Sequence, residues 1–196
     1  NHTEAQPNLF DLIIHNLFKD FIPTHLGGTH PLGGRFRQLY KKITQAYNRK
    51  TYDYWDGVPE MAAYEKLLRK VLDEVFLQLN AFLIKYFKLN LRVWYALTPL
   101  VSTLWWREIP TEIQLEIKLN GVLVRHQSDF LNEARLSALA ICLYLAVIKK
   151  NPQQIDLKVL FLDDVFIGLD LTNRLPILDI LKNEFSDYQV FISTYD

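Results

Sequence analysis

Apolar residues recur at helical spacing through the first part of the chain. This pattern predicts helices at residues 8–21, 36–47 and 60–87, with a glycine-rich stretch at 23–35 between the first two. The stretch YWDGVP, residues 54–59, predicts a turn before the long helix. That helix carries an apolar stripe near a 3.6-residue period, which is typical of a face packed in a core. The stripe consists of Leu67, Leu68, Val71, Leu72, Val75, Leu79, Phe82, Leu83 and Phe87.

After Leu89 the spacing of apolar residues changes to two. The alternation predicts β-strands at residues 91–97 and 112–119. Asn120-Gly121 follows directly, and this dipeptide predicts a tight hairpin because both of its turn positions favour a positive φ.

The last third of the chain predicts a helix and then a parallel β-sheet. Helical spacing returns at residues 128–151, and a strand is predicted at 156–163, a helix at 172–185 and a second strand at 188–194. A strand, a helix and a strand in this order are typical of a βαβ unit, in which the two strands lie parallel. Ligands of such sheets bind at the carboxyl ends of the strands.

The composition excludes several classes of protein. Lys+Arg and Asp+Glu balance at 22 each, so any nucleic-acid contact must come from a local basic cluster. The single cysteine, Cys142, indicates a reducing compartment and is expected in the core. No apolar run reaches the ~20 residues that span a membrane, and no signal peptide is evident. We therefore expect a cytoplasmic protein without membrane contact. The chain lacks an initiator Met and reads as a piece of a longer protein.

Chemistry is concentrated where the first predicted strand of the βαβ unit ends. The stretch VLFLDD, residues 159–164, runs from apolar residues into two carboxylates, and an unpaired buried carboxylate is costly. Either the strand end faces water or a cation neutralises the pair. Apolar residues followed by an acid pair are also the Walker B pattern of ATPases, in which the acids support Mg²⁺ and the attacking water.

Four segments in order resemble the C-terminal half of an ABC-type ATPase head. They are LNEARLSALAICLYLA, VLFLDD, GLD and VFISTYD. Within that class the resemblance is greatest to the SMC, RecF and SbcC group, and bacterial anti-phage ATPases share this style of signature. The resemblance covers residues 89–196. It implies an α/β lobe, a parallel sheet with flanking helices, preceded by a mostly helical insertion or arm at 1–88.

The resemblance implies a role for several residues. Asp163 matches the Mg²⁺-supporting aspartate, and Asp164 stands where the family has its catalytic glutamate. Asp170, at the end of the GLD segment, matches the D-loop aspartate that faces a partner head. Tyr195 stands where many members have the switch histidine, and a tyrosine donates a hydrogen bond to phosphate without carrying a positive charge. The two departures, at Asp164 and Tyr195, make slow turnover plausible.

The signature segment diverges most from the family pattern. Ser128 or Asn132 is a natural N-cap for the helix that follows. Asn132 also takes the place of the signature serine, which contacts the γ-phosphate of ATP bound by the other head, with Glu133 and Arg135 beside it. The alternative is that Asn132 is an N-cap and nothing more. A helix N-terminus suits phosphate because of its free N–H groups and dipole.

The resemblance implies that ATP with Mg²⁺ joins two copies of the head and that hydrolysis releases them. No Walker A sequence occurs in the chain, since Gly34 is followed by Arg35 and Phe36, so the phosphate loop is expected outside it. Three functions stay open: a DNA-associated ATPase with an effector such as a nuclease, an ABC transporter subunit, and a scaffold without turnover. A DNA surface, if present, is expected at Arg35, Arg37, Lys41, Lys42, Arg49 and Lys50.

Overall fold

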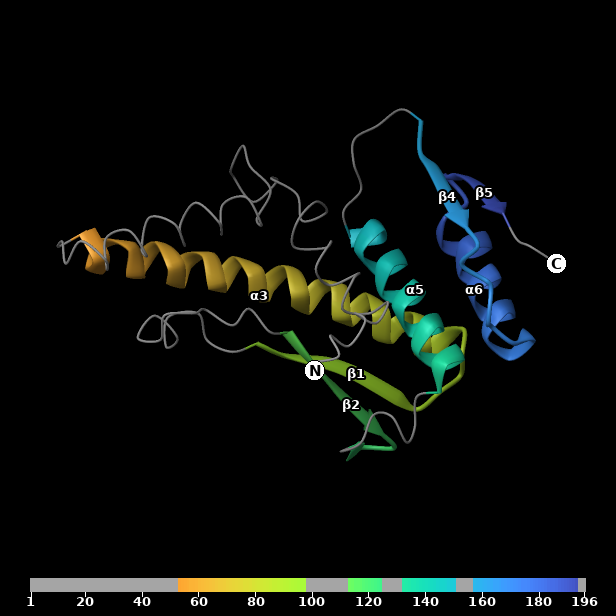
Figure 1. Cartoon of the computed structure of the whole chain (residues 1–196), viewed down its shortest axis with the longest axis horizontal. Coiled ribbons are helices and arrows are strands. Elements are labelled where there is room, and N and C mark those ends of the chain that lie inside the picture. Colours follow the sequence, from red (N-terminus) through yellow and green to blue (C-terminus); the bar gives the residue numbers. More distant parts are fainter. Residues whose placement is uncertain (1–52, 98–112, 125–131, 151–156, 194–196) are drawn as a thin grey trace, which may run out of the picture. The chain divides into compact units, whose positions relative to one another are not determined.

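The computed structural model describes residues 53–97, 113–124, 132–150 and 157–193 (Figure 1). These residues fall into two compact units. Of the described residues, the larger unit contains 75–94 and those from 116 onward, and the smaller contains 53–74, 95–97 and 113–115. The larger unit carries the predicted ATPase motifs, while the boundary at residues 88–89 stays a prediction.

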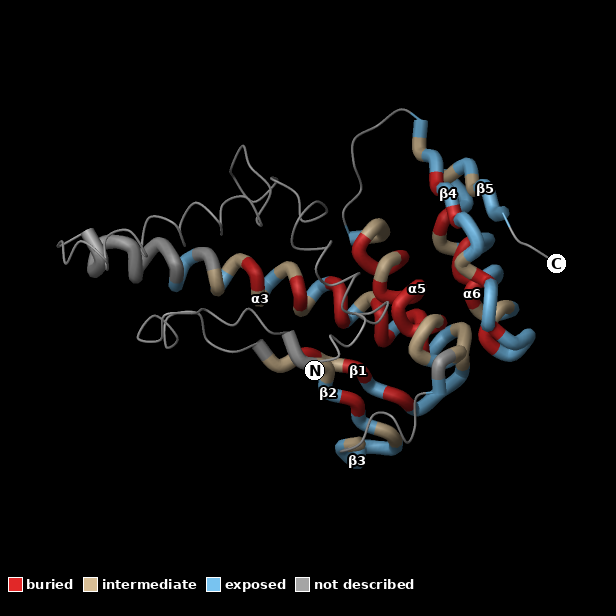
Figure 2. The backbone as a smooth tube through the Cα atoms, in the orientation of Figure 1, coloured by how far each residue is buried: buried red, intermediate tan, exposed pale blue. Residues whose placement is uncertain are grey.

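Helix α3 spans Asp53–Lys85, which is 33 residues. Most of the predicted apolar stripe is buried (Figure 2), whereas Leu67, Val71 and Phe87 are partly exposed. Phe76, which was not in the predicted stripe, is fully buried as well. The turn predicted for residues 54–59 is wrong, because these residues are helical. Pro59 lies near the start of α3, where its missing N–H removes one hydrogen bond from a long cooperative helix and does not end it.

Strands β1 (Leu91–Leu97), β2 (Ile113–Leu119) and β3 (Val122–Leu123) form one sheet in that order. Strands β2 and β3 are antiparallel and are joined by the predicted hairpin. Asn120 and Gly121 have φ values of 51° and 83°, as a two-residue turn of this kind requires. The hairpin prediction is therefore confirmed.

A buried asparagine joins α3 to β1. The side chain of Asn80 donates to the carbonyl of Val93 at 2.7 Å and accepts from its N–H at 2.8 Å. The same amide also donates to the carbonyl of Phe76 at 2.7 Å. A side-chain amide that pairs with both main-chain groups of a strand residue satisfies them as a neighbouring strand would. Asn80 thus gives the last turns of α3 a fixed register against β1.

The remaining elements are α5 (Glu133–Lys150), β4 (Val159–Asp163), α6 (Leu171–Glu184) and β5 (Gln189–Ser193). Strands β4 and β5 are parallel, which confirms the predicted βαβ unit. Helices α5 and α6 pack against each other. Helix α5 is buried along most of its length, and Cys142 lies fully inside the core, where burial raises the pKa of its thiol.

None of the helices in the described ranges has the length and apolar character needed to cross a bilayer.

Candidate functional site

The acid pair lies at the carboxyl end of β4, beside the last residue of β5. Asp163 and Ser193 are direct partners in the parallel ladder, and both are exposed. The Ser193 hydroxyl donates to Oδ1 of Asp163 at 2.6 Å. The main-chain N–H of Asp164 donates to the carbonyl of Ser193 at 3.1 Å. Asp163 and Asp164 thus lie at the end of the sheet where ligands of parallel sheets bind, in contact with Ser193, which was not predicted as a site residue.

Asp164 adopts a left-handed backbone conformation, with φ at 53°. Among residues other than glycine, aspartate and asparagine adopt this region most readily, whereas longer side chains do so less often. The carbonyl of Asp164 accepts from the N–H of Ile167 at 3.2 Å, so the chain turns at once after the strand. This backbone offers a local reason for aspartate where the resemblance places glutamate.

No cation of the described residues neutralises the acid pair. The ion pairs in this part of the chain join other groups, and neither Asp163 nor Asp164 takes part. The described ranges also contain no cluster of three or more His, Cys, Asp or Glu suited to a metal ion. Mg²⁺, however, is usually held by one or two carboxylates together with waters and substrate phosphates. Two exposed carboxylates at one strand end fit that contribution.

The segment that matches the D-loop is built around Asp170. Gly168 has φ at 79°, a conformation that favours glycine, and Asp170 is the N-cap of α6. Its Oδ1 accepts from the Thr172 hydroxyl at 2.7 Å and from the N–H of Asn173 at 3.0 Å. These bonds, with that of Thr172 the larger cause, lower the pKa of the Asp170 carboxyl. One carboxylate oxygen therefore has a structural task in capping the helix.

The signature segment begins helix α5. The side-chain oxygen of Asn132 accepts from the N–H of Arg135 at 2.9 Å, which confirms Asn132 as the N-cap. Asn132 and Arg135 are exposed, and Glu133 is the first residue of the helix. Tyr195 and the alternative cap Ser128 lie outside the described residues. Contact of Asn132 with a nucleotide stays a prediction.

The face of the β4–β5 sheet that bears the site is apolar. Phe161 is 70% exposed and stacks on Phe191, with ring centroids 4.7 Å apart. Phe161 and Asp163 are two residues apart on β4 and lie on the same face, opposite the buried Leu160 and Leu162. Parallel sheets are usually covered on both faces. Whatever covers the two phenylalanines will also border Asp163.

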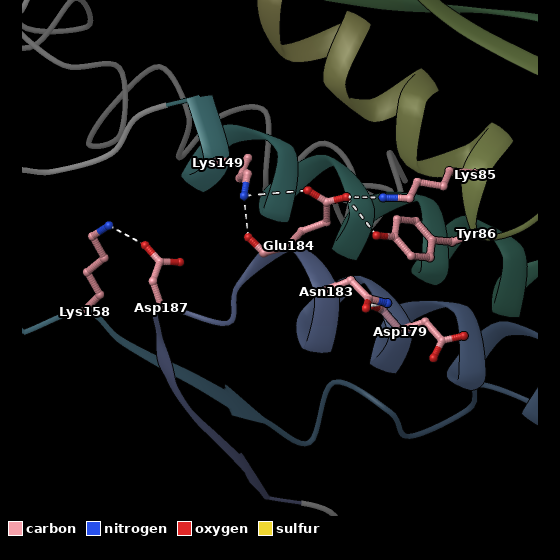
Figure 3. A network of polar contacts seen from close by, with 8 residues as sticks. All are labelled: Lys85, Tyr86, Lys149, Lys158, Asp179, Asn183, Glu184 and Asp187. Carbon is pink, nitrogen blue, oxygen red and sulfur yellow. Dashed lines mark hydrogen bonds and ion pairs between the residues drawn. The ribbon is translucent and has the colours of Figure 1, made fainter.

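Glu184, a carboxylate that the sequence analysis did not single out, lies at the end of α6 (Figure 3). One oxygen of Glu184 accepts from Lys85 Nζ and from the Tyr86 hydroxyl, both at 2.8 Å. Its other oxygen is 3.6 Å from Lys149 Nζ, and Lys149 also donates to the Glu184 carbonyl. The bond from Lys85 is the main cause that lowers the pKa of Glu184. Because its partners are up to 99 positions away, no local pattern announces this cluster.

No protein-family model and no curated protein sequence matches the chain. Solved structures do match. One concerns SMC ATPases, their ATP-driven dimerization and their DNA-stimulated activation. It matches at 13% identity with a TM-score of 0.51, covering 67% of this chain and 73% of that chain. Another is an SMC head bound to the C-winged helix domain of ScpA, at 15% identity with a TM-score of 0.45, covering 93% of this chain and 46% of that one.

The first of these matches defines the fold. The chain has the mixed helix and strand architecture of an SMC-like ATPase head, with a parallel sheet and flanking helices. The resemblance found in the four sequence segments is thus confirmed for the fold. At 13% identity the likeness carries no information about individual side chains.

Proposed function

We propose that this chain is part of an ATP-hydrolysing SMC-like head that dimerises around ATP. The observation that carries the proposal is the exposed acid pair at the carboxyl end of β4, which no cation of the described residues neutralises. Ligands of parallel α/β sheets bind at this end of the strands. A carboxylate pair held there without counter-charge is suited to a divalent cation and a polyphosphate.

The two acids have different tasks in the proposed reaction. Asp163 supports Mg²⁺, which when bound neutralises charge on the β- and γ-phosphates. Asp164 accepts a hydrogen bond from the attacking water and orients it toward the γ-phosphate. A phosphate-binding loop on the same polypeptide completes the site, and we expect it to border the apolar face that carries Phe161 and Phe191. Tyr195 is proposed to donate a hydrogen bond to phosphate.

The start of α5 is proposed to act on the nucleotide of a second copy. Capping uses only the oxygen of the Asn132 side chain, so its NH₂ group keeps its two hydrogens for a γ-phosphate. The N-terminal N–H groups of α5 favour an anion at the same place. Glu133, Arg135 and Asp170 are proposed to line this contact. ATP then lies between two heads, and hydrolysis separates them.

The test is the replacement Asp164→Asn in the full-length polypeptide, which is expected to include the phosphate loop. Asparagine adopts the left-handed region as readily as aspartate, so the backbone at residue 164 is preserved. We expect ATP binding to be retained, phosphate release to fall by about 10²–10⁴-fold, and dimers to accumulate with ATP. Phosphate release is measured in single turnover and dimerisation by light scattering. Phosphate release at the native rate would contradict the role of Asp164.

A scaffold that binds ATP without turnover is the second candidate. Two departures from the family favour it, namely the shorter acid at residue 164 and the tyrosine at residue 195. A carboxylate one methylene shorter holds a water less closely to the phosphate. ATP-dependent dimers that form without phosphate release in the unmodified protein would select the scaffold over the hydrolase.

Action on DNA with an effector such as a nuclease completes the proposal. The basic cluster around Lys41 and Lys42 lies outside the described residues. If it contacts phosphates, DNA affinity falls steeply with salt because each neutralised phosphate releases counterions. Replacing both lysines by glutamate is then expected to weaken binding to all sequences alike and to flatten the salt dependence. An unchanged salt slope would assign the DNA contact to another surface or to the effector.

A further inference from the structure

Ser193 makes two hydrogen bonds to the acid pair, one through its side chain and one through its main chain. Its hydroxyl donates to Oδ1 of Asp163 at 2.6 Å, and its carbonyl accepts from the N–H of Asp164 at 3.1 Å. The ladder pairs Asp163 directly with Ser193, so the two side chains stand on neighbouring strands at the same level. A single residue of β5 therefore contacts both acids at the end of β4.

The two bonds restrict different degrees of freedom. The bond from the Ser193 hydroxyl to Oδ1 favours one side-chain rotamer of Asp163. In that rotamer the second carboxylate oxygen, Oδ2, points in one direction. The main-chain bond holds the turn at Asp164, whose φ of 53° is a conformation that few residues adopt freely. Side chains that bind cations are commonly oriented by a hydrogen bond from a neighbouring group. The Ser193 hydroxyl has the position and the chemistry for this task.

Solvent exposure gives a reason why this bond is needed. Both Asp163 and Ser193 are exposed, and no packing of neighbouring side chains confines an exposed carboxylate. Without a donor, the Asp163 side chain would sample several rotamers and would lose that entropy on binding a cation. Hydrogen bonds to an ionised acceptor are also shorter and stronger than neutral ones, in keeping with the 2.6 Å separation.

We propose that Ser193 is a positioning residue that aims the Asp163 carboxylate at the divalent cation of the nucleotide site. The proposal rests on the proposed function, because it takes Asp163 as the residue that supports Mg²⁺. It adds a residue of β5 that lies in the segment VFISTYD but was given no role by the resemblance. It predicts that the serine hydroxyl contributes to cation affinity while contributing nothing to nucleotide affinity without metal.

The experiment compares Ser193→Thr with Ser193→Val in the full-length polypeptide, which is expected to include the phosphate loop. Threonine and valine have the same shape and both favour strands, so the two variants differ only in the hydroxyl. Ser186→Ala is the control, because Ser186 is an exposed serine just before the same strand. The readout is the affinity for Mn²⁺ in the presence of ATP, measured by electron paramagnetic resonance, together with metal-free ATP binding.

We expect Ser193→Val to weaken Mn²⁺ binding by about 10-fold or more, the range found for groups that orient metal ligands. Ser193→Thr and Ser186→Ala should bind Mn²⁺ as the unmodified protein does, and metal-free ATP binding should be equal in all of them. Equal Mn²⁺ affinity in Ser193→Val and Ser193→Thr would overturn the proposal. A loss of metal-free ATP binding in Ser193→Val alone would also overturn it, because the hydroxyl would then act on the nucleotide.

Asp163→Asn separates this inference from the proposed function. If Asp163→Asn abolishes Mn²⁺ binding while Ser193→Val does not change it, the metal site stands and the role of Ser193 is wrong. If Asp163→Asn leaves Mn²⁺ binding unchanged, the proposed function is wrong at its metal site, and the inference about Ser193 is overturned with it.

Discussion

Two carboxylate sites of the larger unit differ in how they are neutralised. Glu184 is surrounded by its own chain, with Lys85, Lys149 and the Tyr86 hydroxyl within hydrogen-bond or ion-pair distance. The acid pair at the end of β4 is exposed and receives one hydroxyl and no cation from the described residues. We call the Glu184 site closed, because cations of its own chain neutralise the carboxylate. We call the acid pair at Asp163 and Asp164 open, because no cation of the described residues does so.

The difference separates a structural role from a binding role. A carboxylate that is already neutralised within the fold has little affinity for an added cation. Its ion pairs instead stabilise the contact between the elements that carry them. Glu184 joins the end of α6 to α5 and to the end of α3 (Figure 3). Two adjacent carboxylates without counter-charge repel each other, so the fold tolerates them at a cost that a bound cation removes. Open carboxylates are therefore candidates for function, and closed ones for stability.

The largest stability effect is expected at the closed site. Glu184→Gln removes the charge that faces two lysines but keeps the size of the side chain. The free energy of unfolding should fall by about 1–2 kcal/mol, since hydrogen bonds to charged groups contribute more than neutral ones. Asp163→Asn, its counterpart at the open site, should leave stability unchanged or raise it slightly. Urea unfolding of the two variants checks the contrast, and a larger loss in Asp163→Asn would reverse it.

Acid should remove the contribution of Glu184. Its pKa is lowered from an ordinary value of 4.5, so the ionised form is favoured in the folded state. The stabilisation is present above pH 4.5 and is lost as the pH falls through the lowered folded pKa. The stability difference between the unmodified protein and Glu184→Gln should be constant from pH 7 to about 5 and shrink below that. A difference that persists far into acid would indicate that glutamine perturbs packing.

A smaller effect is expected at Asn132, which combines a structural task with a proposed binding task. Asn132→Ala removes the N-cap of α5 and should cost about 1 kcal/mol. Asn132→Asp keeps a capping oxygen and should cost only a fraction of that. Both variants lack the amide, so a comparison of ATP-dependent dimerisation with unfolding separates the two tasks. Dimerisation that follows stability in both variants would leave Asn132 as an N-cap alone.

The smallest effect is expected from the backbone at residue 164. Asp164→Glu introduces the acid found in the family, but its longer side chain fits the left-handed region less well. A loss of about 0.5–1 kcal/mol is expected, whereas Asp164→Asn should be nearly neutral. Thermal unfolding in the absence of nucleotide measures the difference. Equal stability of the glutamate and asparagine variants would mean that the backbone does not select the shorter acid.

The sequence predicted those parts of the fold that local patterns control. The Asn120-Gly121 hairpin and the N-cap at Asn132 depend on residues a few positions apart, and both are confirmed. The βαβ unit was predicted from the order of three locally patterned segments and is confirmed too. The turn at residues 54–59 failed because a long helix extends through Gly57 and Pro59. There the cooperativity of a 33-residue helix outweighs the local preference of two residues.

The site was predicted only in part. The pattern of apolar residues followed by two acids pointed to Asp163 and Asp164, since a strand and its end lie together in sequence. Ser193 is 30 positions from Asp163, and Glu184 is 99 from Lys85. Contacts between residues so far apart in the sequence produce no periodic pattern from which a single sequence could predict them. The contact of Ser193 with Asp163 depends on the parallel pairing of β4 with β5. The contacts of Glu184 depend on how the ends of α3, α5 and α6 meet.

The most direct test of the account is the Mg²⁺ dependence of ATP binding in Asp163→Asn, with Glu184→Gln as the matched control. Each variant replaces one carboxylate of the larger unit by the amide of the same size. Titration calorimetry with and without Mg²⁺ gives the gain in ATP affinity that the cation provides. The account predicts that Asp163→Asn loses this gain and that Glu184→Gln keeps it. An unchanged gain in Asp163→Asn would contradict the claim that the open acid pair is the metal site.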